Sequence, residues 1–103
     1  MQPALAKVKT LENFLLKHGE DAYISTTLAK MLEYKIRKYG NELAALQQDL
    51  RELENKYAMP SAEFFAKFQR GILGDEMDFI EWAALYQMHQ ALLEKKKALE
   101  VES

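Results

Sequence analysis

The side chains best suited to chemistry are gathered in one short segment, FQRGILGDEMDFIEW, at residues 68–82. Four carboxylates lie within seven residues there, and two carboxylates held close together can act as general acid and general base. A helix start, however, attracts acids through the helix dipole alone. The segment has no nucleophile paired with a base, and its glycines lack the lysine of a nucleotide-binding loop. We therefore expect a protein that is not an enzyme.

A metal or cofactor site is not indicated either. The chain has no cysteine and only two histidines, His18 and His89. His18 falls at the end of an expected helix, where an exposed cation is favoured. His89 lies on an apolar stripe, and the di-metal pattern of helical bundles needs a glutamate three residues earlier, where this chain has Tyr86. We expect His89 to be a hydrogen-bonded core or interface residue, with no metal and no cofactor.

The composition indicates one small helical domain, residues 1–103, in the cytoplasm. A chain of 103 residues can form one modest core, and only 4 glycines and 2 prolines leave few sites for turns. The net charge of −2 argues against nonspecific binding to a nucleic-acid backbone. The lack of cysteine fits a reducing compartment, and no apolar run is long enough to cross a bilayer.

The strongest structural signal is a heptad pattern in the centre of the chain. From Ala29 to Tyr57, apolar residues recur at alternating spacings of three and four without a slip. Heptads that stay in phase predict a face that packs as a left-handed coiled coil. We therefore expect a long helix at 26–58. Its seam consists of Leu32, Ile36, Tyr39, Leu43, Leu46, Leu50, Leu53 and Tyr57.

Gly40 and Asn41 offer an alternative, because a glycine followed by asparagine can end one helix and cap the next. The heptad phase nevertheless crosses Gly40 undisturbed, and Gly40 lies off the seam. A sharp turn would have no reason to preserve this register. We therefore expect a continuous helix that tolerates a cost of about 1 kcal/mol for the glycine.

The N-terminal segment is expected to form a shorter helix at 1–18. Pro3 suits the first turn, where its missing N–H is no loss, although Thr10 is a competing helix start. The apolar stripe ends near Gly19, a typical residue after a helix end.

Two further helices are expected after the long one. Ser61 is a good N-cap for a short helix at 61–70, and Gly71 suits the position after its end. Asp75 can cap a last helix at 75–100. This helix is long enough to lie antiparallel along the central helix. The predicted fold is therefore all-α, a helical hairpin or bundle.

Aromatic residues are concentrated near the segment at 68–82. Six of the eleven rings fall within residues 64–86. Large rings bury much area, so they can build a small core where the short helix folds back on the last one. Exposed rings can instead anchor a partner protein. We expect the cluster to serve both purposes in part.

The heptad face also predicts self-association. A single long helix cannot bury this face, and the first and last helices of the chain can cover only part of it. Leu28, Met31 and Tyr34 lie off the seam and widen the apolar surface. We therefore expect a homodimer.

The stretch SAEFFAKFQRGILGDEMDFIEWAALYQM, residues 61–88, resembles a family of small helical prokaryotic proteins. Their pattern is a Phe-rich helix, Gly-x-x-Gly-Asp, and then Asp-Phe-x-Glu-Trp. LENFLLKHGEDAYIS and NKYAMPSAEF extend the likeness over most of the chain. Such proteins are often encoded beside a small candidate toxin and are regarded as antitoxin-like, which implies binding and neutralisation of a partner protein. The family pattern leads us to expect glycine after Tyr57, where this chain has Ala58.

If the resemblance holds, the segment at 68–82 is the expected contact with the partner. Its acids would steer a basic partner surface, and its rings would anchor it. The expected partner-binding residues are Phe68, Leu73, Asp75, Asp78, Phe79, Glu81 and Trp82. The alternatives are a scaffolding coiled-coil homodimer and, more remotely, a DNA-binding regulator, although no helix clusters arginine or asparagine.

Overall fold

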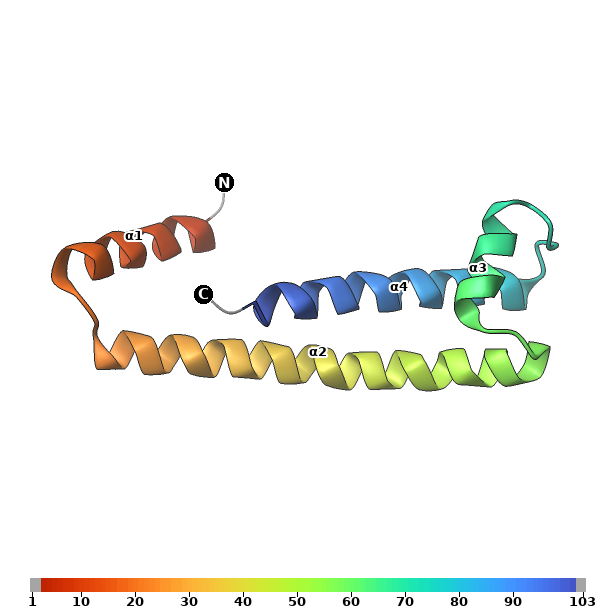
Figure 1. Cartoon of the computed structure of the whole chain (residues 1–103), viewed down its shortest axis with the longest axis horizontal. Helices are drawn as coiled ribbons and strands as arrows, with labels where there is room; N and C mark the ends of the chain where they lie inside the picture. The colour runs from red at the N-terminus through yellow and green to blue at the C-terminus, as the bar shows by residue number, and fades with distance from the viewer. Residues whose placement is uncertain (1–2, 102–103) are drawn as a thin grey trace. The chain divides into compact units, whose positions relative to one another are not determined.

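The computed structural model describes residues 3–101, and in this range the chain is helical without a strand. Its elements are α1 (Pro3–His18), α2 (Ala22–Tyr57), α3 (Ser61–Gln69) and α4 (Met77–Leu99) (Figure 1). The predicted all-α class is confirmed. The expected helix at 1–18 corresponds to α1, and its first two residues lie outside the described range. None of the described helices is long and apolar enough to cross a membrane.

The chain forms two compact units that divide within α2, between Glu33 and Tyr34. The first contains α1 and the beginning of α2, and we call its described part, residues 3–33, the N-terminal hairpin. The second contains the rest of α2 together with α3 and α4.

Helix α2 is one uninterrupted helix of 36 residues. It passes through Gly40, so the continuous helix is confirmed and the alternative of a break at Gly40 is wrong. Its buried residues are Leu43, Leu46 and Leu50, all members of the predicted seam. Burial of this face outweighs the propensity cost of about 1 kcal/mol that a glycine adds to a helix interior.

The beginning of α2 lies four residues earlier than the expected start at Thr26. Asp21 is the reason, because its Oδ1 accepts a hydrogen bond of 3.0 Å from the backbone N–H of Ile24. A side-chain oxygen that accepts from the third helical amide is a standard N-cap. Residues 22–25, which the predicted start left outside the helix, therefore form the first turn of α2.

The end of α2 depends on an alanine in an unusual conformation. Ala58 has a φ of +52°, and the amide of Met59 donates to the carbonyl of Glu54 over 3.2 Å. This six-to-one hydrogen bond is the Schellman ending, in which the left-handed position is usually occupied by glycine. Alanine therefore adopts here the conformation for which the sequence pattern favours glycine.

Helix α3 begins differently from the prediction. Pro60 is its N-cap and makes no side-chain capping bond, so the expectation that Ser61 is the N-cap is wrong. Ser61 is the first helical residue, and its amide donates instead to Glu54 Oε2, 2.9 Å away on α2. A carboxylate from the preceding helix thus satisfies an amide that α3 itself leaves free.

The end of α3 matches the prediction. Gly71 has a φ of +71° and follows the C-cap residue Arg70. The amide of Ile72 donates to the carbonyl of Lys67, and that of Gly71 donates to the carbonyl of Phe68. These two bonds form a complete Schellman motif.

Helix α4 begins at Met77, with Glu76 in the extended conformation of an N-cap. The cap makes no side-chain bond, so the expectation that Asp75 caps this helix is wrong. The amides of Phe79 and Ile80 both donate to the backbone carbonyl of Glu76. Asp78 remains in the first turn, where an acid complements the helix dipole.

Helix α4 packs antiparallel along α2 within the second unit, as predicted (Figure 1). Near one end of the pair, Asp78 at the start of α4 bonds to Lys56 and Tyr57 at the end of α2. Near the other end, a Cβ placed on Gly40 would lie 3.7 Å from Cε of Lys96. Seam residues in the middle of α2 are therefore covered within the same chain.

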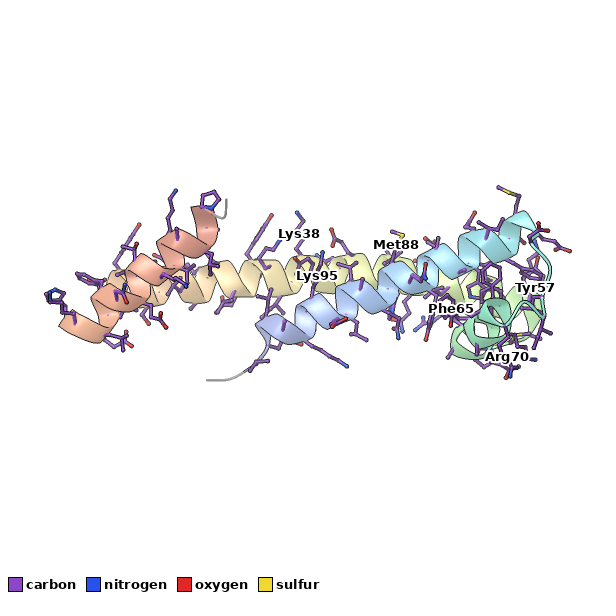
Figure 2. All side chains as sticks on the ribbon, turned by 90° about the horizontal axis from the view of Figure 1, so that it is seen from above. Lys38, Tyr57, Phe65, Arg70, Met88 and Lys95 are labelled. Carbon is purple, nitrogen blue, oxygen red and sulfur yellow. The ribbon has the colours of Figure 1, made fainter. Side chains whose placement is uncertain are left out.

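The core of the second unit lies where α3, α4 and the end of α2 meet. Its buried members are Leu50, Phe64, Trp82 and Ala83. Half-buried apolar residues surround them, including Leu53, Phe65 and Leu85. Figure 2 labels Tyr57 and Phe65 within this group of side chains.

Candidate functional site

The centre of the aromatic cluster is a stacked pair of rings. Phe64 on α3 and Trp82 on α4 lie parallel, with centroids 3.9 Å apart and planes inclined by 5°. Both side chains are fully buried. Nε1 of Trp82 donates to Oγ of Ser61 over 2.9 Å, so the one polar atom of the indole is satisfied. Trp82 is therefore a core residue, and the expectation that it anchors a partner is wrong.

The other rings of the segment pack around this pair. Phe68 lies 5.5 Å from Phe64, and Phe79 lies 5.1 Å from Tyr57, centroid to centroid. Both Phe68 and Phe79 are half-buried, as is Leu73. These apolar members of the predicted partner site therefore first stabilise the fold, and only their outer edges reach solvent.

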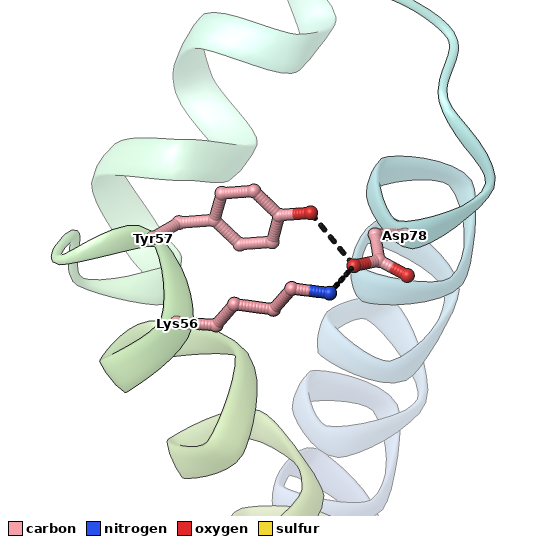
Figure 3. Close-up of polar contacts among 3 residues, drawn as sticks. All are labelled: Lys56, Tyr57 and Asp78. Carbon is pink, nitrogen blue, oxygen red and sulfur yellow. Dashed lines mark hydrogen bonds and ion pairs between the residues drawn. The ribbon is translucent and has the colours of Figure 1, made fainter.

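The four acids of the segment divide into two kinds. Asp78 is engaged within the chain, where its Oδ2 accepts hydrogen bonds of 2.7 Å from both Lys56 Nζ and Tyr57 Oη (Figure 3). Since these donors lie at the end of α2, the carboxylate ties the two helices together. Asp78 therefore has a structural task beside any role in binding.

These contacts change the ionisation of all three groups. The hydrogen bond from Lys56, followed by that from Tyr57, holds the pKa of Asp78 below its ordinary value of 3.8. The same carboxylate raises the pKa of Lys56 above 10.5. The pKa of Tyr57 is also raised above 10.0, first by its hydrogen bond to this carboxylate and then by burial of the phenol. These three groups stabilise the fold most at a pH above the pKa of Asp78 and below the pKa values of Lys56 and Tyr57, because the carboxylate is then charged and both donors keep their protons.

Asp75, Glu76 and Glu81 are exposed. Within residues 3–101, the ion pairs are Lys56–Asp78, Lys67–Glu63 and Lys96–Glu100, so none of these three acids belongs to one. Of the predicted acidic contacts, Asp75 and Glu81 are thus open to a partner. The structure adds Glu76 to them.

An exposed apolar stripe runs along α4 beside these acids. We define the α4 stripe as Met77, Ile80, Ala84 and Met88, which recur at spacings of three and four and therefore share one side of the helix. Met77 is 79% exposed, and Ile80 and Met88 are about half exposed. Figure 2 labels Met88 on α4. Trp82 and Ala83, by contrast, belong to the buried side of the helix.

Sequence reasoning missed the α4 stripe. The aromatic and leucine residues of α4 form the more obvious apolar face of this helix. A second series, at residues 77, 80, 84 and 88, was present in the sequence at the same helical period. A helix that is apolar on two sides buries both, either in its own chain or against another.

The exposed side of α4 combines apolar side chains with acids. Among residues 3–101, no three histidine, aspartate or glutamate side chains gather closely enough to hold a metal ion. The site presents exposed methionine and isoleucine flanked by carboxylates that form no ion pair with another residue of the range 3–101. Methionine adapts its shape to different partners and is frequent at protein-binding surfaces.

Comparisons of this chain with family models, with curated proteins and with solved structures gave no match.

Proposed function

We propose that this protein is a non-enzymatic protein–protein interaction module that binds a partner protein through the α4 stripe and neutralises it in the manner of an antitoxin. The observation that carries the proposal is the exposure of Met77, Ile80 and Met88 on the side of α4 opposite its core contacts. Contiguous exposed apolar surface is typical of an interaction site. The neutralising role rests on the family resemblance.

The flanking charges indicate the chemistry of the partner. Asp75, Glu76 and Glu81 border one end of the α4 stripe and bring three negative charges without an ion-pair partner among the described residues. A basic partner surface would therefore be attracted to this end. Exposed charges at an interface rim increase the rate of association more than they increase affinity.

The test uses the product of the neighbouring reading frame, co-expressed and copurified with this protein. Replacing Ile80 and Met88 by glutamate places two carboxylates in the apolar contact, and we expect binding to weaken roughly hundredfold or more. Val101→Glu is the control, since Val101 is an apolar residue that is more exposed than Ile80 or Met88 and lies after α4. Equal binding by the Ile80/Met88 variant and the control would exclude the α4 stripe as the contact.

A second experiment separates the acids from the apolar contact. The Asp75→Lys/Glu81→Lys variant should associate roughly tenfold more slowly at low salt and lose this defect at high salt. Glu94→Lys is the control, because Glu94 is also exposed on α4 but lies beyond the stripe. Asp78 is left unchanged because its carboxylate joins α4 to α2. Association rates that do not respond to the reversal would remove the acids from the proposal.

A scaffolding homodimer is the second candidate, and a separate observation favours it. The N-terminal hairpin contains no buried side chain among its described residues. This surface is distinct from the α4 stripe.

A further inference from the structure

The N-terminal hairpin has an apolar composition but no core. Every residue that α1 contributes is at least partly exposed, and the buried residues of α2 all lie beyond residue 33. The exposed large apolar residues of the hairpin range from 43% to 80% exposed. They are Leu5, Val8, Phe14, Leu16, Tyr23, Met31 and Leu32. Most of the stability of a helix in a protein comes from packing of its apolar face, and these side chains remain largely unpacked within the hairpin.

Two grooves lie between α1 and the start of α2 within this hairpin. One, of about 410 Å³, is lined mainly by leucines and is flanked by Glu12 and Glu20. The other, of about 320 Å³, includes Lys7, Tyr23 and Met31. On a helix with 100° between residues, Glu12 and Lys7 lie on different flanks of α1. The hairpin therefore offers an apolar groove on each of its two faces.

The charges of the hairpin are balanced. It carries four lysines and four acids, so its formal net charge is 4 − 4 = 0 with histidine neutral. The lysines are Lys7, Lys9, Lys17 and Lys30, and the acids are Glu12, Glu20, Asp21 and Glu33. The net charge of −2 therefore belongs to the rest of the chain. A neutral surface gives no electrostatic preference for a strongly basic or acidic partner, and it does not repel a copy of itself.

The exposed area of one face suits the apolar part of a dimer interface. If a large side chain carries about 200 Å² of surface, the seven residues expose on the order of 800 Å², so each of the two faces offers roughly 400 Å². One partner contributes about 800 Å² to a standard protein interface. Interfaces between identical subunits are also the most apolar kind, because their surfaces are covered permanently. A second copy is the one partner that is always made together with the chain.

We propose that the N-terminal hairpin pairs with the N-terminal hairpin of a second copy, so that four helical segments form one bundle around a shared apolar core. Each copy supplies two helical segments, α1 and the beginning of α2, so that two copies together supply the four helices of such a bundle. The same patch is used on both copies, as in a two-fold dimer. This inference rests on the second candidate function, the scaffolding homodimer, and it is independent of partner binding through the α4 stripe, because it concerns different residues.

Sedimentation of the full-length protein tests the inference without any partner. The wild type should sediment as a dimer, with twice the mass of one 11.9 kDa chain. The Val8→Glu/Leu16→Glu variant should sediment as a monomer, with dimerisation weakened roughly hundredfold or more. Met88→Glu is the matched control and should remain dimeric. A monomeric wild type at submillimolar concentration, or dissociation by Met88→Glu alone, would overturn the inference.

The fluorescence of the single tryptophan measures folding separately from dimerisation. Trp82 is fully buried in the second unit, so its fluorescence reports whether that unit is folded in each variant. A monomeric Val8→Glu/Leu16→Glu variant with native tryptophan emission supports the inference. If the unfolded emission accompanies the loss of the dimer, the experiment with labelled chains described next decides.

The absence of cysteine allows a measurement on nearly unchanged protein. A nitroxide attached at Leu16→Cys in one chain is mixed with ¹⁵N-labelled wild type, and line broadening across chains is recorded by NMR. Broadening within residues 3–33 of the partner copy is expected. Broadening confined to residues 34–101, or none, would contradict the proposed contact. Since no toxin is present, either result leaves the proposed function to its own test.

Discussion

The substitution Ala58→Gly tests how α2 ends. Ala58 is the one non-glycine residue among the described positions with a positive φ, +52°, and it occupies the position after the last turn of α2. The left-handed conformation costs an ordinary residue about 1–2 kcal/mol because Cβ approaches a carbonyl oxygen. Glycine has no such penalty, although its greater freedom in the unfolded chain offsets about 0.5–1 kcal/mol. We therefore expect a gain of about 0.5–1 kcal/mol in the free energy of unfolding.

Thermal and urea unfolding, followed by the fluorescence of Trp82, measure this gain. About 1 kcal/mol corresponds to 4–8 °C for a domain of this size, so the Tm should rise by roughly 2–8 °C. The midpoint in urea should increase with an unchanged slope, because the surface exposed on unfolding is the same.

Gly71→Ala is the matched control, because Gly71 closes α3 in the same way. Its φ is +71°, and an added Cβ would meet no atom within 4 Å, so the substitution introduces conformational strain without a clash. We expect it to lower the free energy of unfolding by about 1 kcal/mol. A decrease in Tm for Ala58→Gly beside a decrease for Gly71→Ala would refute the argument, since the strain at residue 58 would then not be what glycine relieves.

Three further predictions concern the second unit. Ser61→Ala should cost about 1–3 kcal/mol, because Nε1 of the buried Trp82 loses its acceptor. Gly40→Ala should stabilise α2 by about 1 kcal/mol, since the new Cβ makes only an ordinary contact at 3.7 Å. The lowered pKa of Asp78 contributes stability that is present above pH 3.8 and lost as the pH falls through the folded value. Asp78→Asn should therefore flatten the acid side of a plot of Tm against pH.

Each of these predictions has a result that would contradict it. Ser61→Ala with an unchanged midpoint in urea would mean that the indole N–H does not depend on this hydroxyl. Loss of stability in Gly40→Ala would indicate that α2 needs the glycine for close packing. An acid limb that persists in Asp78→Asn would assign the pH dependence to other carboxylates.

The long helix could be predicted because its signal extends over many residues. The heptad phase from Ala29 to Tyr57 is repeated often enough that Gly40 does not obscure it. The buried residues Leu43, Leu46 and Leu50 could therefore be predicted from the whole repeat and not from any single position. Long periodic patterns are the most secure feature of a sequence because one exception changes little.

Helix ends were harder to predict, since each depends on a single competition. Asp21 captures an amide and starts α2 before the heptad pattern begins. Ser61 has the right side chain for an N-cap, but its hydroxyl accepts from Trp82 while Glu54 satisfies its amide. The hydrogen-bond partners at a helix end can come from residues distant in the sequence. Capping preferences consider only the neighbouring residues, so they do not predict such partners.

The candidate site shows the same limit. The sequence indicates that rings and acids gather at 68–82, but it does not tell which side of α4 meets the core. The structure places Trp82 inside and leaves Met77 and Met88 outside. The packing of α4 against both α2 and α3 decides this orientation, because both sides of α4 are apolar.

Helix α2 joins two parts of the protein that differ in how many contacts protect them. Near Leu50 its amides lie over the core, whereas near Tyr23 they belong to the unit in which no described side chain is buried. Hydrogen–deuterium exchange in a dilute sample should therefore quicken steadily toward the start of the same helix. Raising the protein concentration should slow exchange in α1 and in those first turns of α2 but not near Leu50, so that the two ends of one continuous helix respond differently to assembly.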